Sequence, residues 1–165
     1  MINSKLERAL NDQIRKEFYS SYLYLSMAAR FESMNLKGFA HWMQIQAAEE
    51  TQHGMKIYGH VNERGRTVAL QQIDAPPSEW KSAKEMFTEA YHHEQKVTES
   101  INKIVQLART EKDNATETFL QWFVNEQVEE EASTNEITQK LQLAGDTGPA
   151  LLMMDAELHK RAPPP

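Results

Sequence analysis

The stretch of sequence that decides the fold is RGRTVALQQIDAPPSE, residues 64–79, where the helical spacing of apolar residues fails. Gly65, Pro76 and Pro77 mark the ends of this connection, and Ser78 is in place to cap a following helix. Sixteen residues make an unusually long connection for a compact domain. Extended at roughly 3.3 Å per residue they reach about 50 Å, enough to run the length of a helix of about 27 residues. The helices on either side can therefore lie parallel.

Two long stretches of helical apolar spacing lie on each side of this connection. We expect helices over about 4–33 and 37–63 before it, and over about 79–110 and 115–143 after it. The turns within each pair are short, so the two helices of a pair should be antiparallel. The predicted architecture is all-α: a four-helix bundle with one long crossover between the second and third helices.

Several details complete this architecture. Ser4 with Glu7 three residues later has the pattern of a capping box at the start of the first helix. Within residues 67–73 either a short strand or plain loop is compatible with the pattern. A fifth, short amphipathic helix is expected over about 150–160, and the length of the chain favours a single domain over residues 1–165.

The composition excludes several classes of site and partner. The chain contains no cysteine, so neither a disulfide framework nor a thiolate metal site is available. The formal net charge of -6 disfavours a nucleic-acid partner, which would need a basic face. The first residues are polar and no apolar run approaches the roughly 20 residues that span a bilayer, so we expect no secretory signal, no membrane partner and a cytoplasmic protein.

Each predicted long helix interrupts its apolar face with an acid near mid-length. On the first helix this face comprises Leu6, Leu10, Ile14, Glu17, Ser21 and Leu25. At the same level the other helices carry Glu50 and His53, then Glu94, and finally Gln127 and Glu130. Lysine and arginine are absent from these positions, so ion pairing within the faces does not neutralise the acids.

A single glutamate on such a face is more often bent out to solvent than buried. Four acids and a histidine at one level need another explanation, because burying like charges costs many kcal/mol or forces proton uptake at raised pKa values. A pair of divalent cations would compensate the four carboxylates. Ligands of oxygen with one imidazole suit iron better than zinc, and manganese stays open on ligand type.

The second predicted helix carries Glu50-Thr51-Gln52-His53, a Glu-x-x-His motif that di-iron carboxylate bundles use. The fourth helix carries Gln127-Val128-Glu129-Glu130 in the corresponding place. A second iron would thus have fewer nitrogen and charged ligands than the first. We expect it to be held more loosely, which favours turnover and release over a permanent cofactor.

The chain resembles the bacterial non-haem ferritins over nearly its whole length, in the ferritin-like fold. The resemblance rests on Tyr-Leu-Tyr-Leu at 22–25, Ala-Ala-Glu-Glu-Thr-Gln-His at 47–53 and Gln-Trp-Phe-Val-Asn-Glu-Gln at 121–127. It implies one ferroxidase iron bound by Glu17, Glu50 and His53. It implies a second bound by Glu94 and Glu130, with Glu50 bridging and Gln127 nearby.

The resemblance also implies a third iron site beside the pair. The matching residues are Glu49, Glu126, Glu129 and Glu130, although the sequence alone reads residues 129–131 as a solvated acidic run. Tyr24 would be a hydrogen-bonding or one-electron partner of the site. Core packing is the alternative for Tyr24 and for Trp122.

The function implied by the resemblance is iron storage. Fe(II) would be oxidised by O₂ or peroxide at the paired site, and ferric mineral would collect inside a hollow shell of twenty-four subunits. The apolar run at 151–154, on a helix too short to fold alone, favours burial against other subunits. No haem is expected, because Gln52 and Glu130 stand where bacterioferritins carry Met and His. A bacterioferritin-like bundle, a di-iron oxygenase or peroxidase, a DNA-shielding mini-ferritin and a purely structural bundle are the alternatives.

Overall fold

The computed structural model describes residues 2–145 and 147–163, so Met1, Asp146, Pro164 and Pro165 lie outside the described residues. Five helices follow one another: α1 (Ser4–Ser33), α2 (Lys37–Glu63), α3 (Ala83–Thr110), α4 (Asn114–Ala144) and α5 (Gly148–Leu158). The predicted all-α bundle is confirmed. Among the described residues there is no strand, so residues 67–73 are plain loop.

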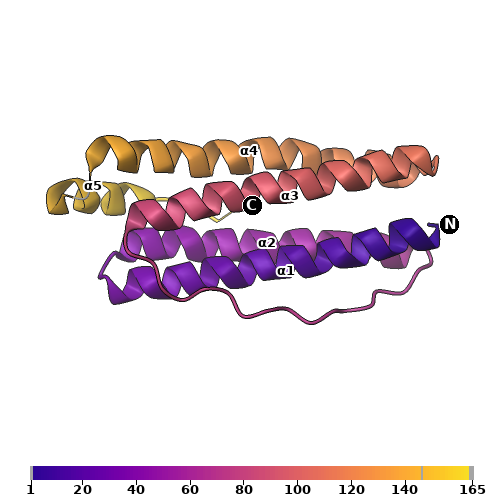
Figure 1. Ribbon diagram of the computed structural model, residues 1–165, viewed down its shortest axis with the longest axis horizontal. Coiled ribbons are helices and arrows are strands. Elements are labelled where there is room, and N and C mark those ends of the chain that lie inside the picture. Colours follow the sequence, from indigo (N-terminus) through magenta and orange to yellow (C-terminus); the bar gives the residue numbers. More distant parts are fainter. Residues whose placement is uncertain (1, 146, 164–165) are drawn as a thin grey trace.

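The connection between α2 and α3 runs the length of the bundle on the side of α1 (Figure 1). It places the start of α3 at the opposite end of the bundle from the end of α2, so that these two helices run parallel. α1 packs most closely on α2, and α3 on α4. The short turns inside each pair and the long crossover between pairs thus give the topology that the spacing predicts. No described helix is both long enough and apolar enough to cross a bilayer.

The start of α1 differs from the predicted capping box. Asn3 is the capping residue, and its side-chain oxygen accepts the backbone N–H groups of Lys5 at 3.0 Å and Leu6 at 2.9 Å. Because this acceptor stands one residue earlier than Ser4, the helix already includes Ser4. The cap predicted at Ser4 with Glu7 is therefore wrong, although the start of the helix is right.

The start of α3 also differs from the prediction. The helix begins at Ala83 instead of Glu79, and the Ser82 hydroxyl, not that of Ser78, caps it by accepting a backbone N–H at 3.1 Å. Trp80 accounts for the difference. Its side chain is buried in the core, and its backbone carbonyl accepts two hydrogen bonds from an arginine of α1. These contacts hold the residues before Ser82 in a non-helical conformation.

A layer of polar side chains divides the apolar core into two clusters. The cluster at the α5 end contains the aromatic side chains of Phe31, Phe39 and Phe87, whereas Leu10 and Ile101 belong to the cluster at the other end. Each cluster draws on all four long helices. The two ends of the bundle are therefore packed independently of the layer between them.

One residue on the predicted face of α1 points outward. Leu25 is 48% exposed, while its neighbour Tyr24 is fully buried. A helix of 30 residues advances 100° per residue, so a seam drawn in steps of three and four drifts from the true inward direction along its length. Leu25 was wrongly placed for this reason.

The short helix α5 begins at Gly148 instead of Ala150, and it caps another helix. Asp155 Oδ1 accepts the backbone N–H groups of Gly38 at 2.7 Å and Phe39 at 3.0 Å, at the start of α2. A side chain at position 38 would meet this contact directly, since a Cβ there would lie 1.7 Å from the Asp155 carbonyl oxygen. Gly38 thus allows α5 to approach the start of α2.

Asp155→Ala is expected to destabilise the metal-free protein by about 1–2 kcal/mol, because the first N–H groups of α2 lose a charged cap from α5. Denaturant unfolding followed by circular dichroism measures the loss. Asp74→Ala, at an exposed loop position, is the matched control and should change stability by less than about 0.5 kcal/mol. Equal unfolding midpoints for the two variants would contradict the capping role of Asp155.

Candidate metal centre

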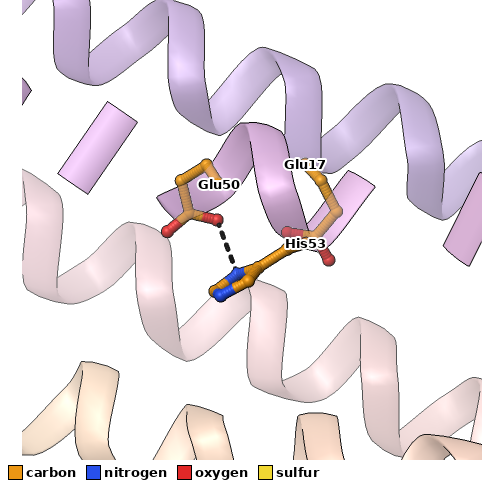
Figure 2. A group of neighbouring side chains, drawn as sticks. All are labelled: Glu17, Glu50 and His53. Atoms are coloured by element: carbon orange, nitrogen blue, oxygen red, sulfur yellow. Dashed lines mark ion pairs between the residues drawn. The ribbon is translucent and has the colours of Figure 1, made fainter. Parts of the chain in front are cut away.

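Four carboxylates and one imidazole meet inside the bundle at mid-length. α1 contributes Glu17, α2 contributes Glu50 and His53, α3 contributes Glu94 and α4 contributes Glu130, and all five side chains are buried. Glu50 and His53 are one helical turn apart and so project from the same face of α2. Figure 2 shows their side chains turned toward the same space as Glu17, with His53 Nδ1 3.3 Å from Glu50 Oε2.

Three groups of side chains at this level, two of them drawn from these five residues alone, have ligand atoms close enough to hold a metal ion. The first is Glu17, Glu50 and His53, and the second is Glu50, Glu94 and Glu130; in each, the ligand atoms lie within 4.8 Å of one another. Glu50 belongs to both and is therefore in place to bridge two ions. A third group joins His53 and Glu130 to Glu126.

Two buried glutamines orient the carboxylates, and sequence reasoning assigned neither of them a role. Gln13 Nε2 donates to Glu17 Oε1 at 2.8 Å, while Gln13 Oε1 accepts from the Ser100 hydroxyl at 2.6 Å. Gln46 Nε2 donates to Glu50 Oε1 at 3.0 Å and to Glu130 Oε2 at 2.6 Å. Each glutamine stands four residues before a glutamate of the same helix face, and this spacing was the signal available in the sequence.

Tyr24 and Gln127 both donate hydrogen bonds to Glu94. The Tyr24 hydroxyl donates to a carboxylate oxygen of Glu94, so the tyrosine is a hydrogen-bonding neighbour of the carboxylates. Gln127 Nε2 donates to Glu94 Oε2 at 3.1 Å and to the Glu94 carbonyl oxygen at 3.3 Å. Gln127 therefore presents an amide donor to Glu94. Trp122 is 38% exposed and packs edge-on against His53, so it is not a core residue.

The residues expected at a third iron site are only partly brought together. Glu126 Oε1 lies 3.9 Å from His53 Nε2 and belongs to the third group with Glu130. Glu49 is engaged elsewhere, in an ion pair with Arg161. The side chain of Glu129 is exposed and belongs to none of the three groups.

The carboxyl groups of the layer are buried close to one another, which favours their protonated, uncharged form. Burial raises the pKa of Glu17 to about 7 and that of Glu50 and Glu130 well above the ordinary range, with neighbouring carboxylates adding to the rise at Glu50 and Glu130. Burial also lowers the pKa of His53 to about 4, which leaves the imidazole neutral and its lone pair free to bind a metal. Among the described residues, Glu17 Oε2 is buried with no hydrogen-bond partner. A divalent cation would satisfy both the charge and this oxygen.

This set of ligands is suited to a hard or borderline cation. Carboxylates dominate, one imidazole is present and thiolates are absent from the sequence. Such a set suits iron and manganese better than zinc at a structural site. Carboxylates can also shift between bridging and terminal binding, which accommodates a metal that changes its oxidation state.

Comparisons with known proteins agree with this geometry. The family model described as "Ferritin-like domain" matches residues 7–144. The chain is 41% identical over 161 residues to a bacterial non-heme ferritin of Bacteroides fragilis strain 638R, covering 98% of this chain and 100% of that protein. It is 38% identical to a bacterial non-heme ferritin of Staphylococcus aureus strain MRSA252, over 98% of this chain and 97% of that protein.

Solved ferritin structures also resemble the chain, both in fold and in sequence. A structure described as a novel open pore ferritin from the hyperthermophilic archaeon Archaeoglobus fulgidus superimposes with a TM-score of 0.97 at 51% identity, covering 98% of both chains. A humanized archaeal ferritin superimposes with a TM-score of 0.98 at 50% identity, covering 100% of both chains.

Proposed function

The chain belongs to the ferritin family of iron storage proteins, and from that membership we propose that it is a ferroxidase, which oxidises Fe(II) at the polar layer between its four long helices. The observation that carries the proposal is the position of Glu50 in two overlapping metal-holding groups. One Fe(II) would bind to Glu17, Glu50 and His53. A second would bind to Glu50, Glu94 and Glu130.

In this proposal iron is the substrate. Each Fe(II) loses one electron to become Fe(III), and O₂ accepts the two electrons with two protons to form hydrogen peroxide. Peroxide can serve as the oxidant in the same way, accepting two electrons and two protons to give water. Hydrolysis of the Fe(III) ions to ferric oxyhydroxide then releases protons. Cation binding also displaces protons from the carboxyl groups, because their raised pKa values keep part of them protonated near neutral pH.

The two iron positions are unequal. The first includes the imidazole of His53, while the second is all carboxylate, and Gln127 faces Glu94 with a donor instead of a ligand oxygen. This asymmetry supports looser binding at the second position. Product would leave through the group of His53, Glu126 and Glu130 toward the storage space, where acidic side chains nucleate mineral.

We further propose that the chain assembles into the hollow shell of twenty-four subunits. Family membership supports self-association, and so do large apolar side chains that lie exposed in the single chain. Leu143 is 88% exposed at the end of α4, and Leu152 and Met153 are exposed on α5. Neighbouring apolar side chains left exposed, such as Leu152 and Met153, are typical of surfaces buried by a partner. The space enclosed by the shell would hold the mineral.

Iron loading in air tests the proposed function. Fe(II) added to the metal-free protein under air should give ferric absorbance many times faster than Fe(II) in buffer alone. Size-exclusion mass and bound iron per chain are then measured on the same sample. A very large particle that holds many irons per chain supports oxidation coupled to storage. A small oligomer with about two irons per chain would instead indicate a di-iron oxygenase, and a rate equal to that of buffer would overturn the ferroxidase proposal.

A further inference from the structure

After α5 the chain continues alongside α2, where Arg161 contacts that helix. From α5 the trace returns toward the middle of the bundle (Figure 1). Arg161 Nη2 donates to Glu49 Oε2, and Arg161 Nη1 donates to the Trp42 carbonyl oxygen at 3.3 Å. The guanidinium carbon also lies 4.2 Å above the centre of the Trp42 ring. His41 Nε2 donates a hydrogen bond to the Arg161 carbonyl oxygen at 2.9 Å. Residues 159–163, here called the tail, are thus attached through Arg161.

The ion pair between Arg161 and Glu49 is largely removed from water. Their side chains are 20% and 15% exposed, respectively. A pair at this depth is screened less than a surface pair, so it holds its partners more firmly. By contrast, Lys160, Ala162 and Pro163 are exposed. Apart from the His159 ring, whose centre lies 5.1 Å from that of His41, the side-chain contacts that hold the tail are those of Arg161.

Glu49 lies at the edge of the candidate metal centre. It directly precedes Glu50 and stands one helical turn before His53 on the same side of α2. His53 Nε2 in turn lies 3.9 Å from Glu126 Oε1. Arg161 is thus a positive charge of the protein itself, held beside the acidic group through which product would leave.

We propose that Arg161 is a displaceable counter-ion of Glu49, and that a cation arriving beside Glu126 and Glu130 competes for Glu49 and releases the tail. This inference rests on the proposed function. The guanidinium and a divalent cation compete for the negative charge of the Glu49 carboxylate, and the divalent cation has the greater charge. Arg161 therefore weakens cation binding at this position, so that iron passes through it instead of staying.

Zinc is the probe, because it is divalent and does not change its oxidation state. Metal-free assembled protein is titrated with Zn(II) by calorimetry, and deuterium uptake of the peptide containing residues 159–163 is measured with and without Zn(II). The backbone N–H groups of Lys160 and Arg161 are hydrogen-bonded to Glu157 and Leu158. Zn(II) should therefore speed exchange at these two amides in the wild-type protein.

Arg161→Gln is the informative variant and Lys160→Gln is its control, since each removes one positive charge from the tail. In Arg161→Gln the amides should exchange rapidly even without Zn(II). The weakest Zn(II) site should tighten about five- to tenfold, the effect of removing one competing ion pair, while the two tighter sites stay unchanged. Lys160→Gln should behave like the wild-type protein in both measurements.

Two outcomes would overturn the inference, and they are distinguishable. If two Zn(II) ions bind tightly but neither the tail exchange nor the weakest site differs between Arg161→Gln and Lys160→Gln, Arg161 is not a competing counter-ion and the proposed function stands. If Zn(II) does not bind to the buried carboxylates at all, the proposed function fails and the inference fails with it.

Discussion

Glu50→Gln is expected to slow Fe(II) oxidation by at least about 100-fold, more than the usual loss from a residue that only supports a ligand. Glu50 belongs to both metal-holding groups, so the variant removes a ligand from both iron positions at once. Glutamine keeps the size of the side chain, which excludes a cavity as the cause. The initial rate of ferric absorbance, after rapid mixing of metal-free protein and Fe(II) in air, measures the effect.

The matched control for this variant is Glu63→Gln. Glu63 lies on the same helix as Glu50, but its side chain is exposed near the end of α2. Its rate should equal that of the wild-type protein. A Glu50→Gln protein that oxidised iron within threefold of the control would show that oxidation takes place away from the polar layer.

The metal-free protein is expected to lose stability as the pH rises from 6.5 to 8. Glu17 has a pKa near 7 in the folded chain against an ordinary value of 4.5, and the pKa values of Glu50 and Glu130 are raised further by burial among like charges. The folded state thus holds protons that the unfolded state has already released. Stability from this source is complete below the unfolded pKa and is lost as the pH rises through the folded one.

The choice of pH window separates these carboxylates from the histidines. Burial lowers the pKa of His53 and His93 to about 4, so below pH 6.5 the unfolded chain takes up protons that the folded chain refuses, and stability changes in the opposite direction. At pH 6.5 an unfolded imidazole is still about half protonated, so each of these two histidines offsets the loss by only about 0.4 kcal/mol over the window. Each carboxyl that stays protonated across this window lowers the free energy of unfolding by about 1.4 kcal/mol per pH unit, which is about 2 kcal/mol over the whole window. One or two such carboxyls therefore give an expected loss of about 2–4 kcal/mol.

Unfolding midpoints at pH 6.5 and pH 8, in the presence of a chelator, measure this dependence. Glu50→Gln should flatten it and raise the midpoint at pH 8, because an amide carries no charge to bury. A divalent cation should restore the wild-type midpoint at pH 8 by compensating the carboxylates. A wild-type midpoint that rises between pH 6.5 and 8 would contradict the assignment of buried, protonated carboxyl groups.

The sequence predicted best what depends on local periodicity and on connection length. The bounds of α2 follow from apolar spacing alone, and the length of the crossover alone led to the parallel arrangement of α2 and α3. The acids from Glu17 to Glu130 stood out because a carboxylate on an apolar face is chemically conspicuous. A glutamine on such a face is less unusual, so the sequence did not distinguish Gln13 and Gln46 from ordinary polar residues.

What the sequence could not predict depends on contacts between distant residues. The start of α3 is displaced because Trp80 is buried against α1, and no local pattern reveals that burial. Arg161 lies 112 positions from Glu49 along the chain, and a lone arginine after the last helix carries no periodic signal. The phase error at Leu25 has another origin, since small angular errors accumulate along a long helix.

The division of the apolar core by a polar layer has a consequence for protein design. Each end of the bundle packs through its own apolar cluster, and these two clusters together hold the four helices in place. The side chains of the middle layer are therefore not needed to specify the fold. The side chains of that layer can therefore be substituted as a set. Other metal-binding or apolar side chains could replace those at its few inward positions. The flanking clusters would keep the four helices in register while the metal-binding properties of the layer change.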